Sequence, residues 1–243
     1  MLQPVRTKYR KAFKGRIHGN ASRAVKLNYE KGNSTFDIIF KNKEILVHGF
    51  KLPMPGDHNI SNSLAAVAVA HHFSMPIKTV KEAIEGFKGV NRRFTELGTF
   101  NGIKIIDDYG HHPVEISAVL QAARQITVGK VIAIHQPHRY TRMRDLFESF
   151  CTCFENADHV VITEIFSAGE ETIDGISQES LVCGIIDQGH KNVHSIVGLN
   201  DFKDLILSIA QEGDIIIFLG AGSISSWAKN LSVMLSAREI INK

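Results

Sequence analysis

The chain has 243 residues, of which 44% are hydrophobic and 22% are charged, so it is long enough to bury one or two sizeable cores. Its 28 basic and 25 acidic residues give a net charge of +3 and form no long basic block, which argues against a nucleic-acid partner. The sequence shows neither a secretory start nor an apolar run long enough to span a bilayer, so we predict a cytoplasmic chain with no membrane span.

The first part of the chain predicts a small antiparallel sheet followed by two helices. Residues 1–20 are rich in basic residues and weakly periodic, which indicates either a disordered arm or the edge of a larger unit. Three short apolar runs follow, at 24–30, 34–40 and 43–50, separated by "KGN" and "KN", and we expect an antiparallel meander. Asp57 is suited to cap a helix over 58–73, and Pro76 precedes a second helix over 77–87.

From Phe94 onward the sequence alternates between apolar strands and helical stretches. The predicted strands are 103–107, 130–135, 159–163, 193–197 and 214–220, and the predicted helices are 113–126, 142–156, 177–188, 201–211 and 223–237. This alternation predicts an α/β fold, a Rossmann-like, doubly wound and mostly parallel sheet covered on both faces. We place a domain boundary in "KGVNRR", which gives one domain over 1–90 and another over 91–243.

Cys151, Cys153 and Cys183 lack the spacing of paired metal ligands. A C-x-C pair on a helix directs its two sulfurs to different sides, so we predict buried free thiols.

Four polar or glycine-rich loops follow the carboxyl ends of the predicted strands. They are "DDYGHHP", "HQPHRYTR", "TEIFSAGEE" and "GAGS". In an open parallel sheet, ligands bind outside these ends, where the loops converge. We therefore predict a binding site at this edge.

The loop "HQPHRYTR" is strongly basic. It contains His135, His138, Arg139 and Arg142, with Arg144 close behind. Arginine grips phosphate or carboxylate with two hydrogen bonds, so the loop predicts an anion site, the alternative being a solvated basic start of a helix.

In "DDYGHHP", Asp107 and Asp108 have two possible roles. Either one caps the turn while the other binds its neighbour's backbone amide, or they offer an acceptor for hydroxyls such as those of a ribose. The neighbouring His111 and His112 have no third ligand at a fixed spacing, so we predict no metal site there.

Two other features have a structural and a functional reading. Asn59 and Asn62 share one face of a helix start, which suits either capping or the edge of an adenine ring. "GAGS" is a weak dinucleotide fingerprint, and close strand-to-helix packing explains its glycines equally well.

Five segments occur in the order found in the Mur ligases, which this sequence resembles from about residue 24 to its end. They are "PGDHNISNSLAAVAVA", "GVNRRF", "DDYGHHPVEI", "HQPHRYTRMRDL" and "GAGSI". The resemblance implies a three-domain, ATP-dependent enzyme, and "QPHRYTR" is similar to the branch that joins L-alanine to UDP-N-acetylmuramate. Its implied substrates are therefore ATP, L-alanine and UDP-N-acetylmuramate, with Mg²⁺ in the complete enzyme.

The resemblance also implies roles for nine residues. Asn59 and Asn62 match asparagines at the adenine, Arg93 matches a hinge arginine that reaches the nucleotide, and Asp108 matches a residue near the ribose. A further set falls where the family gathers its amino acid and muramate substrates: Tyr109, His111, His138, Arg139 and Arg142. The catalytic residues that it implies are Arg93, His111, Arg139 and Arg142.

One departure from the family pattern changes the functional expectation. The sequence contains no G-x-x-x-x-G-K-[ST], and its only Gly-Lys pair, Gly129 and Lys130, opens a predicted strand. We therefore expect residues 1–90 to be the last part of the central ATPase-like domain, without the UDP-binding domain, in a chain that is inactive without a complementary N-terminal polypeptide. The alternatives are a non-catalytic module that binds a nucleotide or amino acid, and a fragment of a muramate:peptide ligase.

Overall fold

The computed structural model describes residues 21–30, 33–40 and 45–241, with side chains described over 33–40 and 47–234. The chain divides into two compact units, Met1–Gly89 and Val90–Lys243. The predicted basic arm over 1–20 and the two predicted meander turns lie wholly or partly outside the described residues.

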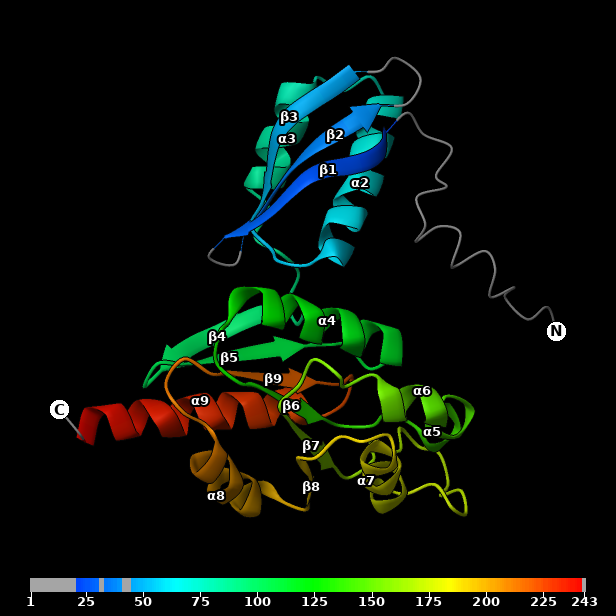
Figure 1. Ribbon diagram of the computed structural model, residues 1–243, viewed down its shortest axis with the longest axis vertical. Coiled ribbons are helices and arrows are strands. Elements are labelled where there is room, and N and C mark those ends of the chain that lie inside the picture. The colour runs from blue at the N-terminus through cyan, green and yellow to red at the C-terminus, as the bar shows by residue number, and fades with distance from the viewer. Residues whose placement is uncertain (1–20, 31–32, 41–44, 242–243) are drawn as a thin grey trace. The chain divides into compact units, whose positions relative to one another are not determined.

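The first unit contains the predicted antiparallel meander, which is confirmed. Its strands are β1 (Ala21–Glu30), β2 (Asn33–Phe40) and β3 (Ile45–Leu52), paired in that order. Two helices follow them, α2 (Asp57–His72) and α3 (Ile77–Glu85), and Figure 1 shows both beside the sheet. Phe36, Ile38, Phe50, Ile60 and Val67 are buried together between the sheet and the helices, which gives this unit a core of its own.

The start of α2 differs from the prediction. Gly56, with φ 99°, is the residue before the helix, no side chain caps it, and Asp57 is the first helical residue. The prediction of Asp57 as the cap was therefore wrong by one position. The chain needs a positive φ at the entry to this helix, which glycine adopts without steric cost.

The second unit is built on a six-stranded sheet. Its strands are β4 (Thr95–Phe100), β5 (Ile103–Asp108), β6 (Val131–His135), β7 (His159–Thr163), β8 (Val193–Ile196) and β9 (Ile215–Leu219). Their order is β4-β5-β9-β6-β7-β8, and all neighbours are parallel except β4 and β5. The predicted mostly parallel sheet is confirmed. The sequence analysis missed β4, because this edge strand is only partly buried and "TELGTF" lacks an apolar run.

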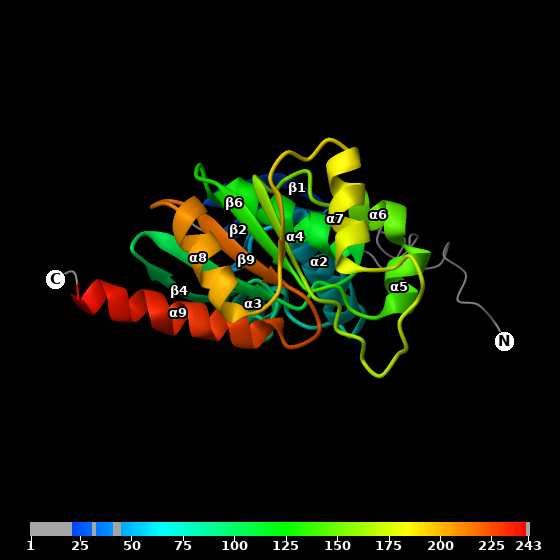
Figure 2. The same cartoon turned by 90° about the horizontal axis from the view of Figure 1, so that it is seen from below.

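Helices cover both faces of this sheet, as Figures 1 and 2 show. One face carries α4 (Pro113–Ile126), α5 (Tyr140–Asp145), α6 (Phe147–Thr152) and α7 (Gln178–Asp187). The other carries α8 (Leu199–Ile209) and α9 (Ile224–Ile241). Because both faces are buried, the strands are continuous apolar runs, which explains why they could be read from the sequence. No helix in the described part of the chain has the length and apolar character needed to cross a membrane.

Two local predictions were wrong. The single helix expected over 142–156 is two short helices, because Leu146 leaves the helical region with φ −124° and ψ 18°. Met143 and Phe150 reach the same core on either side of this break, so apolar spacing alone could not reveal it. Cys151 and Cys153 are buried as predicted, but Cys183 is exposed.

The strand order places three strand ends side by side. Strand β9 lies between β5 and β6, and Asp108, Leu219 and His135 are paired at the last level of their strands. The loops after β5, β6 and β9 therefore start next to one another, at the point where the strand order reverses. This is where open α/β sheets bind ligands.

Candidate functional site

Asp108 joins the segment before β4 to the loop after β5. Its side chain is 2% exposed; Oδ1 accepts the Gly110 N–H at 2.6 Å, and Oδ2 accepts the Phe94 N–H at 2.7 Å. Burial raises the pKa of this carboxyl to about 6, although the two backbone N–H groups act in the opposite direction. Asp108 thus organises the turn, and its contact with a ribose stays a prediction.

Asp107 and Arg92 form a second connection at the same strand end. Ser225 Oγ donates to both carboxylate oxygens of Asp107, at 3.1 and 2.9 Å, and Arg92 Nε lies 3.6 Å from Oδ2. The Arg92 guanidinium donates to the Gly220 carbonyl and lies 4.9 Å from the centroid of the Tyr109 ring. Arg92 therefore links the loops after β5 and β9.

Arg93, which the sequence analysis selected, is less tightly held. It is exposed, with Nη1 3.6 Å from Glu115 Oε1 and its guanidinium 5.9 Å from the Tyr109 ring centroid. Arg93 is therefore an exposed guanidinium with one ion-pair partner, and its contact with a nucleotide stays a prediction.

The contacts of His111 fix its tautomer. Its Nδ1 lies 2.9 Å from the Tyr109 carbonyl oxygen, which can only accept, so Nδ1 carries the hydrogen. In the neutral ring, Nε2 then carries no hydrogen, and its lone pair can accept one. His112 has a different role: it is the N-cap of α4, and its Nδ1 accepts the Val114 N–H at 3.3 Å.

The contacts of His138 fix the opposite tautomer. Arg142 Nη1 lies 3.1 Å from His138 Nδ1, and because guanidinium only donates, Nδ1 must accept. Burial, then the charges of Arg142, His111 and Arg139, lower the pKa of His138. The neutral ring therefore presents an Nε2–H donor.

The two histidines face each other across adjacent loops. Their ring centroids are 5.8 Å apart, and the Tyr109 ring meets His111 edge-on at 5.2 Å. The structure thus brings together Tyr109, His111, His138 and Arg142 from the predicted set. Arg139 is in the same loop, is exposed, and has a positive φ of 73°.

The two predicted adenine asparagines are in the first unit and differ in exposure. Asn59 is 9% exposed, and its amide nitrogen donates to the Pro55 carbonyl at 2.7 Å, which is the local helix-start role. Asn62 is exposed on the same helix. Of the pair, Asn62 is therefore the side chain that is open to a ligand.

The floor of the site is apolar and tightly packed. His135 is fully buried beside Phe150 and Phe154, its Nδ1 lies 3.1 Å from the Leu219 carbonyl oxygen, and burial lowers its pKa to about 3. A Cβ added at Gly222 would lie 2.5 Å from the side chain of Gln136, so the backbone can approach this closely only with glycine. Packing therefore accounts for the glycines of "GAGS".

Comparison with known proteins identifies the family. Residues 92–222 match the model of the Mur ligase, glutamate ligase domain. The chain belongs to the Mur ligase family. It is 54% identical, over 214 residues, to UDP-N-acetylmuramate--L-alanine ligase of Jannaschia sp., and 51% identical, over 223 residues, to that of Paracoccus denitrificans. These matches cover 88% and 89% of this chain but 45% and 47% of the relatives, so the chain spans about half their length.

Solved structures agree with this assignment. UDP-N-acetylmuramate-alanine ligase from Thermotoga maritima superposes with a TM-score of 0.72 at 26% identity, covering 88% of this chain and 46% of that one. A murein peptide ligase from Psychrobacter arcticus, with a TM-score of 0.59 at 24% identity, covers 87% and 43% and shares the fold.

Three residues of this Mur ligase chain were missed by the sequence analysis. Arg92 is more deeply built into the site than Arg93, and no local pattern separates adjacent arginines. Glu115 accepts the N–H groups of His111 and His112, at 3.2 and 3.3 Å, and its spacing after His112 is that of a capping box, which could have revealed it. Phe166 stacks on His138 at 5.4 Å from the next loop along the edge.

Metal coordination finds no support in the part of the chain that the structure describes. It contains no group of three or more His, Cys, Asp or Glu side chains placed to hold a metal ion.

Proposed function

We propose that this chain is the C-terminal part of an ATP-dependent ligase that joins L-alanine to UDP-N-acetylmuramate through an acyl phosphate. The names of its relatives support the reaction, and one observation in the structure carries the proposal. At one edge of the sheet, two histidines with opposite fixed tautomers lie beside a pair of arginines. This arrangement meets the needs of an amino acid that must be held by its carboxylate and deprotonated at its amine.

The carboxylate of the amino acid would be held by Arg139 and Arg142. Guanidinium groups meet a carboxylate with paired N–H donors, and the loop that carries them opens at the carboxyl edge of β6. The Nε2–H of His138, whose Nδ1 contacts Arg142, would add a third donor. The exposed Tyr109 ring, near His111, forms a wall for a small side chain.

The amine would lose its proton to His111. An ammonium group cannot attack a carbonyl carbon, so a proton acceptor has to lie beside it, and the free Nε2 lone pair of His111 is such an acceptor. His111 first takes one proton from the ammonium, and the lone pair so released forms the new N–C bond. Phosphate then leaves with the electron pair of the broken C–O bond, and it takes up the second proton that the nitrogen loses.

ATP would supply the phosphoryl group that activates the substrate carboxylate. Asn62 and Arg93 are exposed side chains suited to an adenine edge and a phosphate, whereas Asn59 and Asp108 are buried and engaged locally, and their nucleotide contacts stay predictions. The described residues include no group of three side chains that could hold a Mg²⁺ ion, and the sequence contains no P-loop to hold the triphosphate.

We assign residues 1–90 to the last part of the central ATPase-like domain and residues 91–243 to the C-terminal domain. The chain spans about half the length of its relatives, so the UDP-sugar and triphosphate sites would belong to the part of those relatives that this sequence does not match.

A reconstitution assay tests the proposal. The purified chain is mixed with ATP, Mg²⁺, UDP-N-acetylmuramate and L-alanine, with and without the part of the Jannaschia enzyme that this chain does not match. When both polypeptides are present, we expect phosphate release that depends on L-alanine, and we expect none from either polypeptide alone. The Arg142→Ala variant should lose this phosphate release. Arg144→Ala, an exposed arginine on the same helix, is the matched control and should keep the activity.

Two results would count against the proposal. Substantial turnover by the chain alone would contradict its dependence on a second polypeptide. Arg142→Ala and His111→Ala variants that keep wild-type rates in an active mixture would contradict the assigned site.

A further inference from the structure

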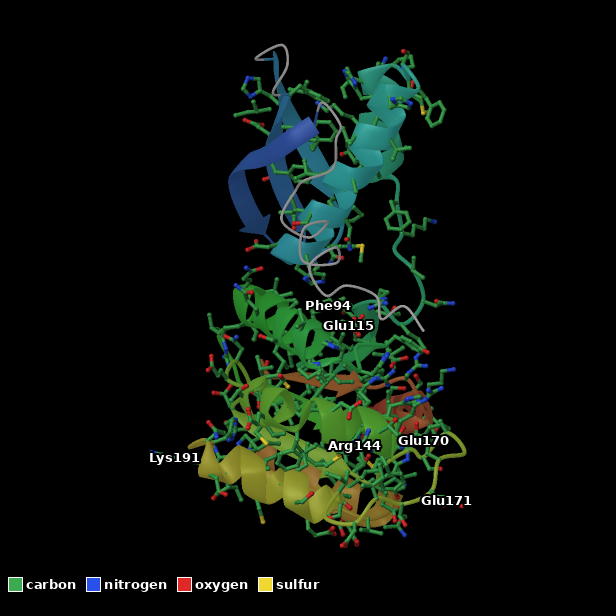
Figure 3. All side chains as sticks on the ribbon, turned by 90° about the vertical axis from the view of Figure 1, so that its right-hand side faces the viewer. Phe94, Glu115, Arg144, Glu170, Glu171 and Lys191 are labelled. Carbon is green, nitrogen blue, oxygen red and sulfur yellow. The ribbon has the colours of Figure 1, made fainter. Side chains whose placement is uncertain are left out.

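A carboxylate from the loop after β7 holds the basic loop after β6. Glu170 Oε2 accepts the Thr141 N–H at 3.0 Å, and Oε1 accepts the Thr141 hydroxyl at 2.7 Å. Figure 3 labels Glu170 and its neighbour Glu171. Thr141 lies between Arg139 and Arg142, so this contact acts on the segment that presents both arginines.

Helix α5 lacks a cap of its own. Its N-cap residue, Arg139, has φ 73° and makes no side-chain cap hydrogen bond. The first N–H groups of a helix have no partner within the helix and need one from outside. Glu170 supplies that partner to Thr141 from 29 residues away.

The turn that delivers Glu170 is strained. The Glu170 N–H donates to the Ser167 carbonyl at 3.1 Å, and the two residues between them, Ala168 and Gly169, have φ values of 53° and 86°. Two successive positive φ values are those of a type I′ turn, which alanine adopts at a cost of about 1 kcal/mol. Strain of this kind persists where the surrounding structure enforces it, and often where function needs it.

Further contacts connect the same two loops. The Arg139 N–H donates to the Phe166 carbonyl at 2.9 Å, and the Phe166 N–H donates to the Pro137 carbonyl at 2.8 Å. The Phe166 ring stacks on His138. Glu170 is thus one of several contacts that connect the loop after β7 to residues 137–141.

We propose that Glu170 is a positioning residue, which fixes the backbone of α5 so that Arg139 and Arg142 meet one anionic group. The identity of that group as the carboxylate of L-alanine rests on the proposed function. The positioning role itself rests only on the contacts above.

The affinity for L-alanine distinguishes positioning from a simple charge effect. In Glu170→Ala, a positioning role predicts weaker binding, whereas the change in charge alone predicts stronger binding. Glu170→Ala removes a negative charge beside two arginines, so charge alone would strengthen binding of a carboxylate. Loss of the cap loosens the loop that carries both arginines. The free energy of one charge-assisted hydrogen bond corresponds to roughly a tenfold change in Kd, which sets the scale of the expected weakening. We expect the Kd for L-alanine, measured by NMR titration of the full chain, to rise by about threefold to tenfold.

Two variants control this measurement. Glu170→Gln removes the charge but keeps one acceptor for Thr141, so it should weaken binding less than Glu170→Ala. Glu171→Ala removes the same charge one residue away, from an exposed side chain, and should leave the affinity unchanged or slightly higher.

A second readout does not depend on the substrate. Burial and the charges of Arg142, His111 and Arg139 lower the pKa of His138, and Glu170 raises it. Removing only the Glu170 charge would therefore lower the pKa of His138 further. If the loop loosens and Arg142 moves away, that pKa rises instead, and the Thr141 amide hydrogen exchanges faster. We expect the rise and the faster exchange in Glu170→Ala, and a smaller change of the same sign in Glu170→Gln, which keeps one acceptor for Thr141.

The outcomes separate this inference from the proposed function. A lower His138 pKa with unchanged exchange at Thr141 in both variants would overturn the positioning role, whatever the substrate. Faster exchange and a raised His138 pKa, in a wild-type chain that does not bind L-alanine, would support the positioning role and contradict the proposed substrate.

Discussion

Carboxylates accept backbone N–H groups at both ends of the six-stranded sheet, but the two ends differ in strain and in the pKa shifts of their buried groups. At the amino end, carboxylates accept backbone N–H groups and stabilise the strand starts. Asp214 is 3% exposed and accepts the N–H groups of Lys130 and Gln211, both at 2.8 Å. Asp158 accepts the Val131 N–H at 2.7 Å and pairs with Arg124; burial alone would raise the pKa of Asp158, but Arg124 and Val131 outweigh it and lower that pKa.

The carboxyl end instead contains several energetically unfavourable features: shifted pKa values, unpaired buried atoms and strained backbone. Asp108 has a raised pKa and His135 a lowered one, both through burial. Among the described residues, three buried side-chain atoms have no hydrogen-bond partner, and two of them, Arg92 Nε and His135 Nε2, are at this end; the third is Gln125 Oε1 in α4. Positive φ values occur at four non-glycine residues here: Arg92, Phe94, Arg139 and Ala168.

This difference indicates a division of labour. Strained residues and shifted protonation states persist only where the rest of the fold can compensate for them, and they concentrate at functional sites. The contacts at the amino end stabilise the fold, and this stability offsets the strain at the carboxyl end, where polar groups are held in the positions that a ligand requires.

The largest expected effect is at His135. The folded chain keeps this histidine neutral, with a pKa of about 3 against 6.5 in the unfolded chain. Its contribution to stability is therefore present above pH 6.5 and is lost as the pH falls from 6.5 toward 3, by up to about 5 kcal/mol. His135→Phe, which fills the space beside Phe150 and Phe154, should remove this part of the acid sensitivity. Urea unfolding at pH 7, 5.5 and 4 measures it; an unchanged pH slope would contradict the neutral state of the buried ring.

The next effect is at the amino end. Asp214→Ala leaves two backbone N–H groups without their acceptor and should reduce the free energy of unfolding by about 3 kcal/mol. Asp214→Asn keeps one acceptor oxygen and should lose about half as much. Binding of L-alanine should be unchanged in the folded variants; a large rise in its Kd would show that the two ends are not independent.

Asp108 should give a pH dependence of the opposite sign to that of His135. Its pKa is raised from 3.8 to about 6 in the folded chain, so the folded state holds more protons between these values. Stability from this group therefore falls as the pH rises through that window, by about 3 kcal/mol. Comparing Asp108→Asn with the parent chain between pH 3.5 and 7 isolates this slope, and equal slopes in the two proteins would argue against a raised pKa.

The smallest effect tests strain directly. Ala168→Gly should leave the stability nearly unchanged, because relief of about 1 kcal/mol of strain at the positive φ is offset by the roughly 0.5–1 kcal/mol that glycine costs through unfolded-state entropy. Ala210→Gly is the matched control: Ala210 has φ −85°, so its replacement should destabilise by roughly 0.5–1 kcal/mol through unfolded-state entropy. Thermal unfolding of both variants supplies the comparison, and losses of equal size would exclude strain at Ala168.

The sequence revealed the sheet and its binding edge more readily than the contacts inside the site. Buried parallel strands are apolar runs, so strand β7 was predicted at its observed bounds, 159–163. The half-buried β4 and the break at Leu146 leave no such pattern. Contacts between distant loops, such as Glu170 with Thr141, depend on the fold and on a strained turn, neither of which local spacing reports.

NMR mapping of L-alanine binding on the isotope-labelled chain shows most directly whether the strained carboxyl edge of the sheet is the ligand-binding edge. We expect chemical-shift changes concentrated in the loops over 109–112, 136–142 and 166–170, and we expect Arg142→Ala to abolish them and Asp214→Asn to preserve them. Shifts centred instead on the strand starts over 127–130, 156–159 and 211–214, or an unaltered response in Arg142→Ala, would contradict this expectation.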